Sequence, residues 1–189
     1  MKSLNHIKLG VALLAAVLTL NLQAGPATPG QVDFGKFSPP ASGGQFVEVN
    51  ISSNLIAMAV RLGAAAQPEI ADVLQGLKGI RVTVIGLDDE NRADIQKRVK
   101  TIRGELDGQG WDRVVVVQQK DQDVVVHIRT RGGESVEGIA VTVLADNQQA
   151  VLVNVIGDLK PEKLALIGEK FNIEPLKKIG LPAAHPETK

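Results

Sequence analysis

His127 is the side chain in this sequence with the widest chemical options, because an imidazole can act near neutral pH as a base, a proton shuttle or a metal ligand. The chain has three histidines, and the other two, His6 and His185, lie close to its ends. A zinc site needs three or four ligands from histidine, cysteine or carboxylate, and the sequence has no cysteine. A zinc site built on histidines would therefore require two chains.

Nucleophilic catalysis would also depend on His127, with Ser52, Ser53 or Ser135 as the nucleophile. None of these serines lies in the Gly-x-Ser-x-Gly pattern that places a serine on a tight turn between a strand and a helix. A histidine on a strand is more often a hydrogen-bonded structural residue than a general base. We therefore assign no catalytic residue. A small periplasmic hydrolase that uses His127 is the alternative function.

Acidic clusters could bind a hard cation such as calcium at Asp121 with Asp123, or at the Asp-Asp-Glu run of residues 88–90. Neither cluster has the spacing of an EF-hand loop, with its central glycine and closing glutamate. Turns and helix caps use the same residue types, and we assign both clusters to those roles. Asp158 follows Gly157 before an expected helix, where a carboxylate favours capping over anion binding. The sequence thus predicts no metal and no cofactor.

The overall composition is that of an ordinary globular chain. Of 189 residues, 44% are hydrophobic and 22% are charged, so one domain with a single core is expected. The 21 basic and 21 acidic side chains give a net charge of +0, which provides no general field to attract nucleic acid or anionic lipid. A basic helix expected near residues 90–107 is interpreted as a solvated helix face, and nucleic-acid binding through it is a third hypothesis that export disfavours.

The first 24 residues have the three parts of a secretory signal. Lys2 and Lys8 give a positive start, residues 9–20 (LGVALLAAVLTL) are apolar, and Ala24 ends a cleavage site. The apolar run has 12 residues, whereas a membrane span needs about 20. We expect export to the periplasm or the medium with cleavage after Ala24, and no transmembrane span in the mature chain. An uncleaved N-terminal anchor is the alternative.

Two further segments are expected to lie outside the folded domain. Residues 25–44 are rich in proline and glycine and predict a flexible linker, in which Phe34 and Phe37 are either exposed or docked on the domain. Residues 180–189 read as a frayed tail. A single α+β domain is expected over residues 45–179.

Four short apolar runs between Arg113 and Ile156 predict a meander of β-strands. They are RVVVVQQ, DVVVHIRT, GIAVTVLA and AVLVNVI, each rich in β-branched residues and separated by turn residues. Earlier strands are expected at residues 46–51 and 80–85, and helices between and after them. The predicted fold class is α+β: a two-layer sandwich with a mixed, mostly antiparallel sheet and helices covering one face.

Alternation along the expected strands separates two faces of the sheet. One face is uniformly aliphatic, and we expect the helices to cover it. The other is mixed, and it defines a candidate binding surface of His127, Arg129, Thr142 and Asn154. Glu48, Arg81 and Thr83 would join that face if the two earlier strands belong to the same sheet.

The segment Val153 to Leu164 (VNVIGDLKPEKL) runs from a hydrophobic strand through Gly157-Asp158 into a helix that begins at a proline. This segment resembles a closing feature of an uncharacterised bacterial family, domain of unknown function 4252 (DUF4252). The order of a signal, a helix-rich first half, a basic middle helix and then strands is also similar, so the resemblance covers roughly residues 46–173. Some members look like lipoproteins, and this chain departs from them because it has no cysteine. The family implies no activity, so it assigns no site residue.

The leading hypothesis is an exported, non-catalytic envelope protein that binds a partner or ligand through the mixed sheet face or an unpaired sheet edge. It rests on the export signal and on the absence of a catalytic constellation in the sequence. The expected partner is another protein or a second copy of the chain.

Overall fold

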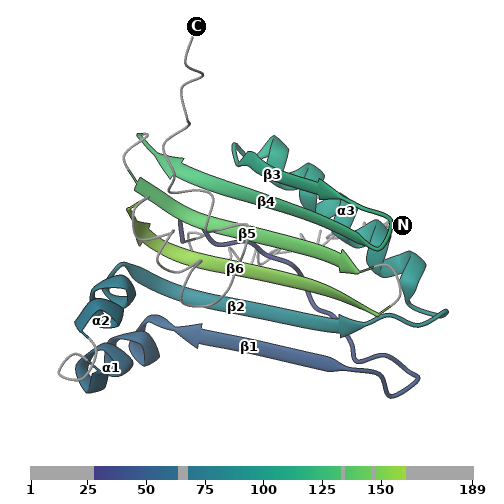
Figure 1. Ribbon diagram of the computed structural model, residues 1–189, viewed down its shortest axis with the longest axis horizontal. Helices are drawn as coiled ribbons and strands as arrows, with labels where there is room; N and C mark the ends of the chain where they lie inside the picture. Colours follow the sequence, from purple (N-terminus) through teal and green to yellow (C-terminus); the bar gives the residue numbers. More distant parts are fainter. Residues whose placement is uncertain (1–27, 64–67, 133–134, 146–147, 161–189) are drawn as a thin grey trace, which may run out of the picture.

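The computed structural model describes residues 28–63, 68–132, 135–145 and 148–160. Its strands are β1 (Phe46–Ser52), β2 (Leu77–Gly86), β3 (Asp112–Gln118), β4 (Gln122–Arg131), β5 (Ser135–Ala145) and β6 (Gln149–Leu159). Its helices are α1 (Ser53–Gly63), α2 (Pro68–Gln75) and α3 (Arg92–Gly108). The strands form one sheet in the order β1-β2-β6-β5-β4-β3 (Figure 1). The fold is therefore α+β, and the predicted meander is present as β3 to β6.

Each neighbouring pair in this sheet is antiparallel, so the expectation of a mixed sheet is wrong. The pair β1 and β2 shows the reason, because two helices separate these strands in the chain. Both α1 and α2 lie at one end of these strands, and α1 begins at Ser53, directly after β1 (Figure 1). The chain returns from α2 at the same end of the sheet that it left, which makes β2 antiparallel to β1.

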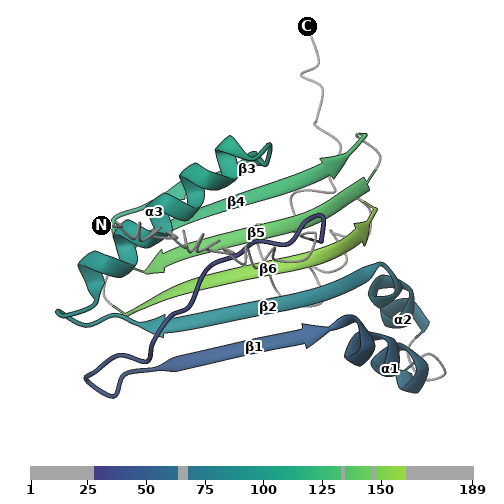
Figure 2. The same cartoon turned by 180° about the vertical axis from the view of Figure 1, so that it is seen from behind.

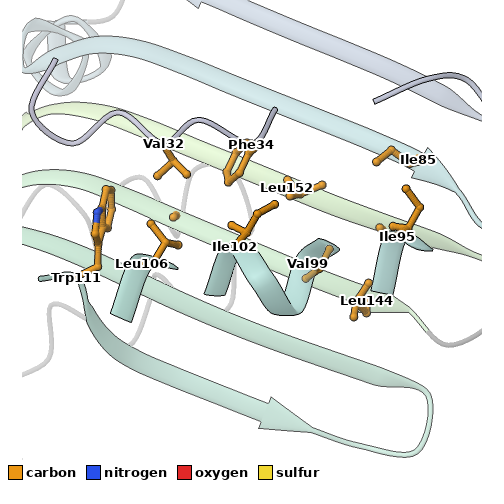
Figure 3. Packing of buried hydrophobic residues seen from close by; sticks show 12 residues of the cluster. Val32, Phe34, Ile85, Ile95, Val99, Ile102, Leu106, Trp111, Leu144 and Leu152 are labelled. Atoms are coloured by element: carbon orange, nitrogen blue, oxygen red, sulfur yellow. The ribbon is translucent and has the colours of Figure 1, made fainter. Parts of the chain in front are cut away.

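Helix α3 packs against the mixed face of the sheet, contrary to the expectation that helices cover the aliphatic face (Figure 2). Ile95, Val99, Ile102 and Leu106 form its apolar stripe, which meets Leu152 and other apolar residues of that face (Figure 3). Helices α1 and α2 instead contribute Ile56, Val60 and Leu74 to the cluster on the aliphatic face. The described helices therefore pack on both sides of the sheet, because the mixed face also carries enough apolar surface to bury a helix.

Residues 28–45, which we call the strap, cross the mixed face beside α3 (Figure 2). Val32 and Phe34 are buried in the same cluster as α3 (Figure 3), and the Arg98 guanidinium lies 3.9 Å from the centre of the Phe37 ring. This part of residues 25–44, expected to be a flexible linker, therefore packs on the sheet, and of the two alternatives for Phe34 the structure shows the docked one. The prolines and glycines of this segment indicate a linker, but two of its apolar side chains, Val32 and Phe34, are buried against the sheet.

Several expectations fall outside the described residues. These are the signal at residues 1–24, the last helix, which should start near Pro161, and the tail at residues 180–189. Among the helices that are described, none has the length and apolar character to cross a membrane.

Candidate functional site

A row of side chains crosses all six strands on the face that carries the strap and α3. In register order its members are Asn50, Arg81, Asn154, Ala140, His127 and Arg113. All except Ala140 are polar or charged. Directly opposite residues in an antiparallel sheet point to the same side, so these groups face the layer above the sheet. The strap and α3 cover the middle of the row and leave its two ends exposed. Buried members of the row therefore differ from exposed ones in what they can contact.

Asn154 fastens the strap to the sheet. Its side-chain oxygen accepts a hydrogen bond from the Val32 N–H at 2.8 Å, and its amide nitrogen donates to the Gly30 carbonyl at 3.0 Å. The same nitrogen donates to the Ile139 carbonyl of β5 at 3.1 Å. The side chain is fully buried, so these bonds satisfy polar groups that water cannot reach.

His127 joins β4 to the end of α3. Its Nε2 donates to a carboxylate oxygen of Asp107 at 3.1 Å, and Arg113 of β3 donates to the other oxygen of the same carboxylate. The ring is fully buried, and its Nδ1 has no hydrogen-bond partner among the described residues. Burial lowers the pKa of His127, against the opposing effect of Asp107. The imidazole is therefore neutral at pH 7.

Arg103 makes a second polar connection between α3 and the sheet. Its guanidinium donates to the Thr142 hydroxyl at 2.8 Å and to the Asp123 carboxylate at 2.8 Å. Arg103 and Thr142 are both buried. The mixed face can thus be covered because α3 supplies Arg103 and Asp107 at the positions where the sheet has polar groups.

The structure brings together three of the four predicted surface residues, but beneath the covering layer. His127, Thr142 and Asn154 are each 0% exposed, so none can meet a partner on the folded surface. Arg129 stays partly exposed, with its nitrogen 3.7 Å from the Glu137 carboxylate. These contacts give His127 a structural role, and no described serine hydroxyl is hydrogen-bonded to it. Across the described ranges, no three metal-binding side chains gather as a cation site would require.

A groove lies between residues 32–35 of the strap and the neighbouring strands β1 and β2. It has a volume of about 170 Å³, and its polar lining comes from Asp33, Glu48, Asn50, Arg81 and Thr83. Arg81 donates to the Gln31 side-chain oxygen at 3.2 and 3.3 Å when that amide is oriented to accept. No described carboxylate lies within 4.0 Å of Arg81 to form an ion pair. The groove can therefore take a polar group beside β1, and its lining has two carboxylates, those of Asp33 and Glu48, for the one guanidinium of Arg81. Alternation along the strands had placed Glu48, Arg81 and Thr83 on this face.

The sheet has two edges, and they differ in how they are protected. The edge strand β3 has a register shift between Arg113 and Val115, and Arg113 is bonded to Asp107 of α3. The edge strand β1 pairs with β2 over seven consecutive residues without a shift, and its sequence FVEVNIS has no lysine, arginine or proline. Bulges, charged side chains and prolines are devices that discourage strand addition, and β1 has one of them, the single carboxylate of Glu48.

The backbone of β1 presents alternate residues to the open edge. The Gly86 N–H donates to the Gln45 carbonyl at 2.6 Å, which makes these two a hydrogen-bonded pair. In an antiparallel ladder such pairs alternate, so Val47, Val49 and Ile51 direct their N–H and C=O groups toward β2. The groups of Phe46, Glu48, Asn50 and Ser52 consequently point outward, where no described strand meets them.

Exposed apolar side chains gather near this same edge. Val49 of β1 is 38% exposed, and Val47 is similar. Helix α1, which follows directly, exposes Leu55, Met58 and Leu62, the last by 78%. These three recur at the spacing of one helix face, opposite the buried Ile56. An open strand edge therefore lies next to apolar surface.

Comparison with known proteins gives one match. No curated protein and no solved structure matches the chain. The family model described as domain of unknown function (DUF4252) matches residues 42–167, which confirms the resemblance found in the sequence. The match runs from just before β1 to beyond the end of β6 and covers more than half of the chain. The chain therefore belongs to the DUF4252 family.

Proposed function

We propose that this protein is an exported module that binds an extended segment of a protein by adding it as a new strand along β1. The observation that carries the proposal is the unprotected edge of β1, set against the bulged and ion-paired edge of β3. Proteins avoid leaving such an edge bare because it pairs with other chains. Strand addition supplies main-chain hydrogen bonds, and the side chains beside the edge then provide specificity.

The two faces beside β1 set what the added strand should look like. On the aliphatic side, its apolar residues would pack on the exposed Val47 and Val49. On the other side, its polar residues would lie over Glu48 and Asn50, next to the groove that holds Arg81. A segment that alternates apolar with polar residues, and has an amide or another uncharged polar group facing the groove, fits both sides.

Export is the second part of the proposal, and it is supported by residues 1–24 alone. Their positive start, apolar run and terminal Ala24 are the pattern of a secretory signal. Mass spectrometry of the protein recovered from periplasm, membranes and medium tests it, with a mature chain beginning at Gly25 as the expected product. An intact N-terminus confined to the membrane fraction would contradict cleavage.

Proline at Asn50 provides a test of the edge, because the N–H of Asn50 points away from β2. This substitution removes an outward donor and leaves the β1–β2 ladder intact. Val116 of β3 is the matched control: the Gln119 N–H donates to the Gln122 carbonyl at 2.8 Å, so alternation points the Val116 N–H outward as well.

The assay is to select extended peptides from a displayed random library on the wild-type protein and then to measure their affinity for both variants. We expect Asn50→Pro to abolish binding and Val116→Pro to preserve it. Circular dichroism and a thermal melt establish that both variants are folded. Equal binding of the selected peptides to wild type and Asn50→Pro would contradict strand addition at β1, and so would failure to select any peptide on a monomeric wild type.

A further inference from the structure

We infer that the strand added to β1 is β1 of a second copy of this chain, antiparallel to the first and centred on Val49. The inference rests on the proposed function and names its partner. A two-fold pairing uses the same edge on both copies, so β1 has to be complementary to itself. The hydrogen-bonding pattern and the side chains of β1 can each be checked for this property.

The backbone pattern restricts the registers that can form. Only residues that point outward can exchange hydrogen bonds across a new interface, and these are Phe46, Glu48, Asn50 and Ser52. Outward residues of one copy must therefore lie opposite outward residues of the other. Three centres satisfy this rule near the middle of the strand: Glu48, Val49 and Asn50.

Side-chain charge and overlap select one of these registers. A centre at Glu48 places two like carboxylates directly opposite each other, which is unfavourable. A centre at Asn50 leaves Phe46 and Val47 beyond the end of the partner strand. The centre at Val49 pairs all of residues 46–52 and sets Glu48 opposite an amide, Asn50 of the partner strand.

The same register matches the faces of the sheet. Val49 meets its own copy, and Val47 lies opposite Ile51 of the second strand, so the exposed valines of both copies come together on the aliphatic side. Glu48 and Asn50 come together on the other side, next to the two grooves that contain Arg81. The result is one continuous antiparallel sheet in which both β1 edges are covered.

Single cysteines test this register directly, because the chain has no cysteine of its own. In the Val49-centred pair, residue 49 faces its own copy at a non-hydrogen-bonded position, where Cα atoms lie about 4.5 Å apart. That separation lies within the range of a disulfide, about 4.4–6.8 Å. Val47→Cys is the matched control, since the two copies of residue 47 would be four residues apart along the strands, at about 3.4 Å per residue.

The experiment uses protein expressed from the full sequence and oxidised with diamide. We expect Val49→Cys to form a disulfide-linked dimer as its main product, and Val47→Cys to stay monomeric on a denaturing gel. Equal cross-linking of the two variants would mean random collision and would overturn the pairing. Predominant cross-linking of Glu48→Cys or Asn50→Cys instead would overturn the Val49 centre.

Analytical ultracentrifugation of the unsubstituted chain and of Asn50→Pro provides a test that needs no cysteine. A dimer that becomes a monomer in Asn50→Pro supports the inference. A monomeric wild type that still binds selected peptides through Asn50 would overturn the second copy as partner and leave the proposed function standing. A monomeric wild type that binds no peptide would overturn both. A dimer that cross-links through Val116→Cys instead of Val49→Cys would overturn the pairing of two β1 strands and leave the proposed function standing.

Discussion

His127 on β4 and Asp107 at the end of α3 are joined by a hydrogen bond of 3.1 Å that fixes the tautomer of the imidazole. Because the carboxylate can only accept, the Nε2 carries the proton. The Nδ1 then keeps a buried lone pair with no donor among the described residues. A second proton would create a buried N–H without an acceptor, which explains why burial lowers the pKa of His127 even beside a carboxylate.

This arrangement predicts that the protein loses stability as the pH falls from about 7.5 to about 5. The pKa of His127 is lower in the folded state than its ordinary value of 6.5, so the unfolded chain binds more protons below that pH. The free energy of unfolding therefore falls as the pH drops below the pKa of the unfolded chain, and it stops falling once the pH is below the pKa of the folded protein. The total loss is about 1.4 kcal/mol for each pH unit that separates the two pKa values. Urea unfolding at both pH values measures the change.

His127→Gln separates this contribution from other titrating groups. We expect the variant to be less stable at neutral pH but to lose less stability on acidification. Asp107→Asn should instead lose more stability on acidification than the wild type, because the carboxylate of Asp107 raises the pKa of His127 and its removal lowers that pKa further. Identical pH slopes for wild type and His127→Gln would show that the ring is not the titrating group.

Asn154 and Asn50 belong to the same row, one at its buried middle and one at its open end, and they form a matched pair. Asn154→Ala leaves the Val32 N–H and the Gly30 carbonyl without their partner, at a cost of about 1–3 kcal/mol for each buried group. Asn50→Ala should change the free energy of unfolding by less than about 0.5 kcal/mol. Denaturant unfolding measures both, and hydrogen exchange at the Val32 amide should accelerate only in Asn154→Ala. Equal protection of that amide in both variants would contradict the anchoring role.

The sequence predicts the strands well because their signal is local. Each run from β3 to β6 alternates or is continuously apolar and is bounded by turn residues, so no distant contact is needed to recognise it. Which strands become edges depends on pairing, and no local pattern distinguishes β1 from β2. The row from Asn50 to Arg113 likewise exists only once the register joins residues that are far apart in the chain.

The strap and the covered face could not be predicted, for a different physical reason. Proline and glycine in residues 28–45 indicate a loop, but the strap is held by the buried Val32 and Phe34 and by two hydrogen bonds to Asn154. The mixed face was expected to be a binding surface because it carries polar residues such as His127 and Thr142. Asp107 and Arg103 of α3 form hydrogen bonds with these two side chains, and that complementarity depends on tertiary contacts.

Gly138 on β5 is predicted to tolerate no side chain, because the strap lies directly against it. A Cβ at this position would lie 2.7 Å from the Trp111 ring and closer still to the Gly30 carbonyl. Gly138→Ala should therefore destabilise the protein by about 1–3 kcal/mol, the usual effect of overpacking. Gly104→Ala on α3 is the control, since a Cβ there meets nothing within 4 Å. That change should stabilise by about 0.4–1 kcal/mol. Thermal melts of both variants decide, and a Gly138→Ala protein as stable as wild type would contradict the close contact.

Arg103 of α3 is bonded to two side chains of the sheet, those of Thr142 and Asp123. Arg103→Met leaves the Asp123 carboxylate without its cation and the Thr142 hydroxyl without its donor. Asp123 keeps 29% of its side chain exposed, so we expect a loss of about 1–3 kcal/mol, below the value for a fully buried pair. Lys100→Met, on the exposed side of the same helix, should stay within about 0.5 kcal/mol of wild type.

A double-mutant cycle tests whether that loss belongs to the pair. Asp123→Leu combined with Arg103→Met removes both charges, so the double variant should recover part of the stability lost in Arg103→Met. Urea unfolding of the four proteins gives the coupling free energy. Strictly additive losses would show that Arg103 stabilises α3 through its contact with Thr142 and its aliphatic packing, and that the charge of Asp123 contributes nothing.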